Sequence, residues 1–144
     1  MKPSFPKILI VEDEKEISDC IKEFLESENY QVGAAENGRE ALDVLSRSSL
    51  PNLILLDMKM PQMNGWQFAE EFKILYGHSV PLLVMTAASQ VELRAKEVKA
   101  DDFIGKPFDF NQLHKKIRKL LENSKNLKET LEESQKPTEV SKSA

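Results

Sequence analysis

Three short, uninterrupted runs of apolar residues stand out along the chain, at positions 8–11, 53–56 and 82–85. Each run is too short for a helix and lacks the alternation of apolar and polar residues that marks a strand with one exposed face. Each is therefore predicted to form a strand buried on both faces. Two weaker strand-like segments, at 30–35 and 102–105, bring the total to five. This pattern is typical of a parallel sheet covered by helices.

The stretches between these strands have helical periodicity. The first predicted helix has a single apolar stripe, formed by Ile17, Cys20, Ile21, Phe24 and Leu25. Because Cys20 falls within that stripe, a buried structural role is predicted for it. Further helices are predicted over 64–75 and 89–98.

Capping residues locate two more helix starts. Asn37 can accept a hydrogen bond from a free backbone amide, and Glu40 has the spacing that completes a capping box. Asp109 and Gln112 have the same spacing at the start of the last helix. Five strands alternating with helices predict an α/β fold of the doubly wound type.

The last helix continues its apolar pattern beyond the region needed to cover a sheet. Its apolar residues have heptad-like spacing and are Leu113, Ile117, Leu120, Leu127 and Leu131. The residues that follow are polar and offer little to bury. We therefore expect one domain over 1–122, followed over 123–144 by a helical extension and then a disordered polar tail.

Composition and charge narrow the possible classes of protein. A net charge of −4 and a pI near 5.3 give no basic surface for nucleic acid, so no nucleic-acid binding is expected of this chain by itself. No apolar run has the length of a signal peptide core or a membrane span, which predicts a cytoplasmic protein that does not bind membranes. The single cysteine excludes an internal disulfide.

Polar side chains follow four of the five predicted strands. Glu12 and Asp13 come after the first, Asp57 after the third, Thr86 after the fourth and Lys106 after the fifth. Parallel strands end at the same edge of a sheet, and doubly wound folds bind their ligands beyond that edge. Each group alone would be an ordinary turn or strand end, but together they predict a binding site.

The chemistry of this site favours a metal ion and a phosphoryl group. Three carboxylates in one cleft repel one another unless a cation joins them. Oxygen donors alone favour Mg²⁺, with Mn²⁺ as a possible substitute. Lys106 and Thr86 are suited to bind phosphoryl oxygens. Asp57 is the best-placed nucleophile and would form an aspartyl-phosphate.

Four motifs together resemble the response-regulator receiver domain of two-component signalling, over residues 7–121. They are VEDE at 11–14, LILLDMKMPQMNGWQF at 53–68, VMTA at 84–87 and ADDFIGKPF at 100–108. The resemblance implies a flavodoxin-like (βα)5 sandwich with a five-stranded parallel sheet of order 2-1-3-4-5. It also implies that the chain is a phosphoacceptor that assists its own phosphorylation and dephosphorylation, and that it is not an enzyme that turns over a separate substrate.

The resemblance further implies a role for each site residue. The ligands of Mg²⁺ would be Glu12, Asp13, Asp57 and the main-chain carbonyl of Lys59. Asp57 would take the phosphoryl group from a sensor histidine kinase or a phosphotransfer protein. Thr86 and Lys106 would bind the phosphoryl oxygens, and the bond before Pro107 would be cis.

In the family, phosphorylation is reported through a change of surface. Thr86 and Phe103 would be the switch residues, and the changed face would be formed by the fourth helix, the fifth strand and the last helix. This face would bind a downstream protein, and the chain would be a monomer or a weak dimer. Phe103 stands where tyrosine is commoner, and a plain core aromatic is the alternative interpretation. His78 and His114 lack metal-ligand spacing and are not expected to carry chemistry.

Three alternatives remain open. The chain could be a receiver fragment of a hybrid histidine kinase or a larger regulator, which the sequence does not separate from a stand-alone form. An aspartate-dependent phosphatase typically has a D-x-D motif on the first strand, whereas Glu12 and Asp13 are adjacent here. A flavodoxin-like cofactor site would need a phosphate-binding loop where this chain has the acidic stretch EDEKE at 12–16.

Overall fold

The computed structural model describes residues 5–58, 60, 63–87 and 100–135, with the backbone alone over 126–135. The described strands are β1 (Lys7–Val11), β2 (Gln31–Ala35), β3 (Leu53–Asp57), β4 (Leu82–Ala87) and β5 (Asp102–Lys106). The described helices are α1 (Lys15–Ser27), α2 (Gly38–Arg47), α3 (Gly65–Tyr76) and α5 (Phe110–Gln135). The strands form one parallel sheet in the order β2-β1-β3-β4-β5. The predicted fold class and strand order are confirmed, and the helix predicted over 89–98 lies outside the described residues.

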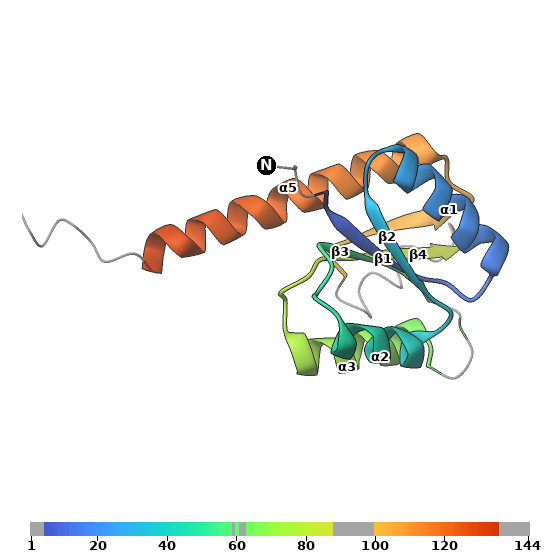
Figure 1. The fold of residues 1–144 in the computed structure, drawn as a ribbon, viewed down its shortest axis with the longest axis horizontal. Coiled ribbons are helices and arrows are strands. Elements are labelled where there is room, and N and C mark those ends of the chain that lie inside the picture. The colour runs from blue at the N-terminus through green and yellow to red at the C-terminus, as the bar shows by residue number, and fades with distance from the viewer. Residues whose placement is uncertain (1–4, 59, 61–62, 88–99, 136–144) are drawn as a thin grey trace, which may run out of the picture.

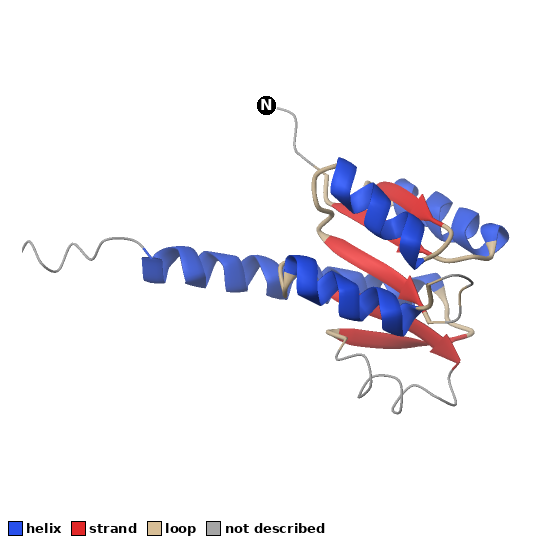
Figure 2. Cartoon of the chain, turned by 90° about the horizontal axis from the view of Figure 1, so that it is seen from below, coloured by secondary structure: helices blue, strands red, loops and turns tan. Residues whose placement is uncertain are grey.

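Helices cover both faces of the sheet. Helices α1 and α5 lie on one face and α2 and α3 on the other, as two views at right angles show (Figures 1 and 2). In β1, Ile8 and Ile10 point into the core on the α1 and α5 side, whereas Leu9 and Val11 point into the core on the other side. Because the cores on both sides of the sheet take apolar side chains from β1, the sequence of this strand is an uninterrupted apolar run.

The predicted capping residues fix two helix starts. The Asn37 side-chain oxygen accepts a hydrogen bond from the Glu40 amide at 2.8 Å, and α2 begins at the next residue. The Asp109 carboxylate accepts from the Gln112 amide at 2.7 Å, one residue before α5 begins. Both helices start next to strand ends, so the capping bonds help fix the loops around the candidate site.

Cys20 does not have the buried position that the sequence predicted. It is exposed, and the buried residues of α1 are Ser18, Ile21 and Leu25. The stripe that faces the sheet is therefore centred on positions 18, 21 and 25, and Cys20 lies at its solvent side. The prediction was wrong because a small polar residue, Ser18, takes the place in the packed stripe that hydrophobicity alone assigned to the cysteine.

Helix α5 is longer than the sheet that it covers. Its first part contributes Leu113, Ile117 and Leu120 to the core shared with α1. Its second part, which runs to Gln135, projects away from the sheet in both views (Figures 1 and 2). Among the described residues, no helix is both long enough and apolar enough to span a membrane.

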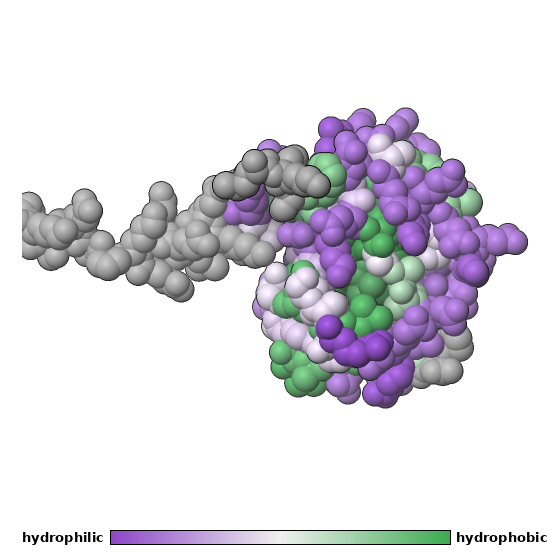
Figure 3. Space-filling model, in the orientation of Figure 1, coloured by the Kyte–Doolittle hydropathy of each residue, from purple (hydrophilic) through white to green (hydrophobic). Residues whose placement is uncertain are grey.

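The surface seen in Figure 3 is mainly polar, with apolar side chains gathered in two places. One is a strip along the edge strand β2, between α1 and α2, where the small or half-buried residues of β2 lie. The other lies at the end of α3, where the side chains of Ile74 and Leu75 are 73% and 59% exposed. The strip along β2 reaches the polar edge of the sheet at Ala35, whose carbonyl accepts the hydrogen bond of the Glu12 amide.

Gly65, the first residue of α3, packs against the end of β3. A Cβ there would lie 2.7 Å from Met58 Sδ and 2.8 Å from the carbonyl oxygen of Asp57. Because backbone must move to make room, Gly65→Ala is expected to lower the free energy of unfolding by roughly 1–3 kcal/mol. In the control Gly33→Ala, the new Cβ would have its nearest neighbour, Leu9 Cδ1, at 3.7 Å, an ordinary contact. Urea unfolding compares the two, and equal stabilities would contradict the steric argument.

Candidate functional site

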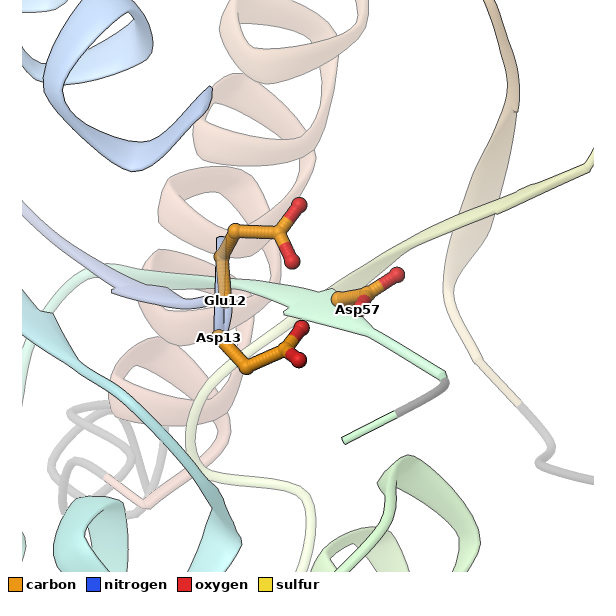
Figure 4. Close-up of side chains that lie close together, drawn as sticks. All are labelled: Glu12, Asp13 and Asp57. Atoms are coloured by element: carbon orange, nitrogen blue, oxygen red, sulfur yellow. The ribbon is translucent and has the colours of Figure 1, made fainter. Parts of the chain in front are cut away.

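Three carboxylates meet at the carboxyl edge of the sheet. Asp57 is the last residue of β3, and Glu12 and Asp13 follow β1, whose Val11 pairs with Leu56 of β3. The backbone amide of Glu12 donates to Ala35 at 3.0 Å, which continues the β1–β2 pairing by one residue and fixes the start of the loop. Each of the three acidic residues offers a carboxylate oxygen within 4.8 Å of the others. Figure 4 shows the three side chains pointing into the same space.

The three acidic residues differ in burial. Glu12 is 2% exposed and Asp57 6%, whereas Asp13 is exposed. Burial raises the pKa of Glu12 to about 7; the hydrogen bond from Lys106 opposes this, and the negative charge of Asp57 adds to it. The charged form of Glu12 is thus disfavoured mainly by burial, and the neighbouring Asp57 carboxylate disfavours it further.

Lys106 is the cation that faces these carboxylates. Its Nζ donates to Glu12 Oε1 at 2.9 Å and to Asp57 Oδ1 at 3.1 Å. Burial by itself would lower the pKa of this ammonium group, but the hydrogen bond to Glu12 and the charge of Asp57 outweigh it and raise the pKa above its usual value. Lys106 therefore stays charged and is held beside the Asp57 carboxylate. The bond from Lys106 to Pro107 is cis.

Strand register brings the other predicted residues to this edge or near it. Asp57 pairs with Met85, the residue before Thr86, and Thr86 in turn pairs with Gly105, the residue before Lys106. The Thr86 side chain is buried. Phe103 pairs with Val84 further back along the strands and is half-buried. Lys59, whose carbonyl was predicted as a metal ligand, lies outside the described residues.

The donor set fits a small, hard divalent cation. All the side-chain donors of the cluster are carboxylate oxygens. Glu12 Oε2 is buried and has no hydrogen-bond partner among the described residues. A buried carboxylate oxygen without a partner is costly, and a bound cation would satisfy it.

Comparison with known proteins decides the family. A family model described as the response regulator receiver domain matches residues 8–118. The chain belongs to this family. Receiver domains bind Mg²⁺ at an acidic pocket, and the acidic cluster of this receiver domain lies at the edge of the sheet where that pocket is expected.

Two curated relatives and one solved structure illustrate the similarity. The receiver domain is 37% identical over 121 residues to the transcriptional regulatory protein PcoR of Escherichia coli, covering 83% of this chain and 53% of the relative. It is 34% identical over 117 residues to sporulation initiation phosphotransferase F of Bacillus subtilis, covering 80% and 93%. The response regulator TrrA of Thermotoga maritima, solved with Mg²⁺ and BeF, matches with a TM-score of 0.72 and 33% identity, covering 81% and 99%. This chain thus spans about half the length of PcoR but nearly all of the other two.

Two features of the receiver domain were not predicted from the sequence. Lys106, assigned to a phosphoryl oxygen, bonds here to both Glu12 and Asp57. Lys116 of α5, which received no role, forms an ion pair with Asp102 of β5. The strand pattern predicts that Lys106 lies near Glu12 and Asp57 but not which of their atoms bond. The contact between Lys116 and Asp102 has no sequence signal, because it depends on how α5 packs on the sheet.

The raised pKa of Glu12 predicts how the stability of the metal-free receiver domain depends on pH. Between about pH 4.5 and 7 the folded state keeps a proton on Glu12 that the unfolded state releases. The contribution of Glu12 to the free energy of unfolding therefore falls as pH rises through this window and is constant above it. The fall is on the order of 3 kcal/mol. Urea unfolding in chelator, compared with Glu12→Gln, isolates this contribution, and a difference that does not vary with pH would contradict it.

Proposed function

We propose that this receiver domain accepts one phosphoryl group on Asp57, in an Mg²⁺-dependent reaction, from a sensor histidine kinase or a phosphotransfer protein. The observation that carries the proposal is the meeting of Asp57 with two further carboxylates and the Lys106 ammonium at one edge of the sheet. This arrangement contains a nucleophile, a set of metal ligands and a fixed positive charge, which are the parts that phosphoryl transfer requires.

The metal ligands would be the carboxylates of Glu12, Asp13 and Asp57 together with the Lys59 carbonyl. When bound, Mg²⁺ supplies charge neutralisation and orients the phosphoryl oxygens, and Mn²⁺ could take its place. The unpartnered, buried Glu12 Oε2 supports a ligand role for Glu12. The exposed Asp13 lies at the mouth of the site.

The chain's own residues carry out the transfer. An Asp57 carboxylate oxygen attacks phosphorus, the bond from phosphorus to the donor's imidazole nitrogen breaks, and its electron pair stays on that nitrogen. The Lys106 ammonium moves from the carboxylates to a phosphoryl oxygen, where it neutralises negative charge. The Thr86 hydroxyl donates a hydrogen bond to another phosphoryl oxygen. Attack of water on phosphorus later breaks the bond from phosphorus to the Asp57 oxygen, releases inorganic phosphate and restores the carboxylate. The same residues would thus assist both phosphorylation and dephosphorylation.

The output follows from the position of the switch residues. Thr86 would move toward the phosphoryl group and the Phe103 ring would move inward, in an equilibrium that phosphorylation biases. The face formed by the segment 89–98, β5 and α5 would then bind a downstream protein. We further propose a cytoplasmic location, a monomer or weak dimer, a receiver unit over 1–122 and an extension with a polar tail over 123–144.

A second possibility concerns what surrounds this domain. The chain spans 53% of PcoR and 50% of the response regulator MprA, so in these relatives the matching segment is part of a longer protein. The domain could equally be part of a larger regulator or of a hybrid histidine kinase. The chemistry proposed for Asp57 is the same in each case.

The proposal is tested by exposing the protein to a small phosphodonor such as acetyl phosphate. With Mg²⁺ present, intact mass spectrometry should show the gain of one phosphoryl group, and a chelator should prevent it. Treatment with hydroxylamine, which cleaves acyl phosphates, should remove the added mass. A gain that is unaffected by both reagents would contradict the proposal.

A further inference from the structure

The Phe103 ring on the edge strand β5 has a cation above it. Phe103 is half-buried and packs against the core on the α2 and α3 side. The ammonium of Lys116, which comes from α5 on the opposite side of the sheet, lies 5.9 Å from the centre of the ring. A cation at this distance over an aromatic face is attracted to it. The Lys116 side chain therefore reaches around the sheet edge to stabilise the present position of the ring.

Asp102 fixes that lysine. Lys116 Nζ lies 3.3 Å and 3.4 Å from the two carboxylate oxygens of Asp102, the residue before Phe103. The same carboxylate accepts a hydrogen bond from the Phe103 amide at 2.8 Å. The Lys116 ammonium thus contacts both the Phe103 ring and the Asp102 carboxylate, and the same carboxylate bonds to the Phe103 backbone. The ring also borders a groove of about 530 Å³ between β5 and α5, which Lys115 and Lys116 line as well.

We propose that Lys116 and Asp102 together hold Phe103 in its half-exposed position and thereby oppose the phosphoryl-bound state. This inference rests on the proposed function, in which the ring moves inward when Asp57 is phosphorylated. Inward movement takes the ring away from the Lys116 ammonium, so the contact is present in one state and lost in the other. An interaction made in only one of two states shifts the equilibrium toward that state.

The expected effect is modest because the contacts are partly exposed. The side chains of Lys116 and Asp102 are 36% and 23% exposed. Contacts of this kind at exposed sites shift an equilibrium by about two- to fivefold. Removing them should therefore tighten the binding of a phosphoryl mimic by about two- to fivefold, which is opposite to the effect of general damage to the fold.

The test measures the affinity of the protein for beryllium fluoride at saturating Mg²⁺, by calorimetry or by fluorine NMR of the bound anion. Lys116→Gln should bind about two- to fivefold more tightly than wild type, whereas Lys116→Arg, which keeps the cation, should bind as wild type does. Lys115→Gln is the matched control, because it removes the same charge from the adjacent position of α5 and should not tighten binding. Asp102→Asn should tighten binding less than Lys116→Gln and add nothing to it in the double variant.

A second readout follows the ring itself in the metal-free protein. In Lys116→Gln, the aromatic NMR signals of Phe103 should shift toward their positions in wild type bound to beryllium fluoride. If Lys116→Gln binds no more tightly than wild type, or if Lys115→Gln tightens binding equally, the inference is overturned while the proposed function stands. If wild type does not bind the mimic at all, the proposed function fails and the inference fails with it.

Discussion

Asp57→Asn is expected to abolish phosphorylation of this receiver domain by a small phosphodonor, with a loss of about a hundredfold or more in the rate of incorporation. An amide cannot attack phosphorus as a carboxylate does, and the substitution also removes one expected metal ligand. The variant should fold at least as well as wild type, because it relieves repulsion between two buried carboxylates that lie side by side. Intact mass spectrometry after reaction with acetyl phosphate and Mg²⁺ measures the loss.

The matched control for this experiment is Asp19→Asn. Asp19 is an exposed residue of α1 that borders the same acidic pocket as Glu12 and Asp13. The Asp19→Asn substitution removes one negative charge near the site and leaves the three clustered carboxylates unchanged. Phosphorylation should therefore continue at close to the wild-type rate. Incorporation that survives in Asp57→Asn, or that is lost equally in Asp19→Asn, would mean that another residue is the nucleophile.

Lys106→Met is expected to have two opposite effects. The Lys106 ammonium bonds to Glu12 and Asp57, and its positive charge repels a metal ion bound to the same carboxylates. Unit charges about 4 Å apart interact by roughly 1 kcal/mol in water and by more where water is excluded, so Mg²⁺ affinity should rise by about tenfold. The rate of phosphorylation should fall by about ten- to a hundredfold, because a positive charge that stabilises the transferring group is lost. Calorimetry measures the first effect and mass spectrometry the second.

Lys115→Met is a suitable control for Lys106→Met. Lys115 lies on α5 and lines the groove beside β5. Lys115→Met therefore has the same net charge as Lys106→Met but leaves the three carboxylates and Lys106 unchanged. It should leave Mg²⁺ affinity within about twofold of wild type, since Lys115 is exposed and charges in solvent are largely screened. A fall in both Mg²⁺ affinity and phosphorylation in Lys106→Met would contradict the view that the lysine opposes metal binding at the shared carboxylates.

The three central strands of the sheet, β1, β3 and β4, were predictable from the sequence because they are buried on both faces. The predicted run 53–56, for example, became β3 over Leu53–Asp57, with every residue buried. A strand buried on both faces has a local signature, since nearly all its residues must be apolar. The convergence of Glu12, Asp57 and Lys106 followed from the same logic, because parallel strands end at one edge.

Other features could not be predicted because they depend on packing between distant segments. Cys20 is exposed, contrary to the prediction, because the buried stripe of α1 is rotated slightly from the predicted one and includes Ser18 instead. The position of the Lys116 ammonium over Phe103 depends on how α5 crosses the edge of β5, and sequence periodicity does not determine that crossing. Local patterns therefore gave the strands and the site, but not the contacts that control the position of the switch aromatic.

The central claim is that Asp57 is the residue that receives the phosphoryl group. It is tested most directly by mapping the modification after reaction with acetyl phosphate and Mg²⁺, followed by borohydride reduction, proteolysis and tandem mass spectrometry. We expect Asp57 alone to be converted to homoserine, and no conversion when a chelator is present. Modification at another residue, such as His78 or His114, or conversion that is unchanged by the chelator, would contradict the account.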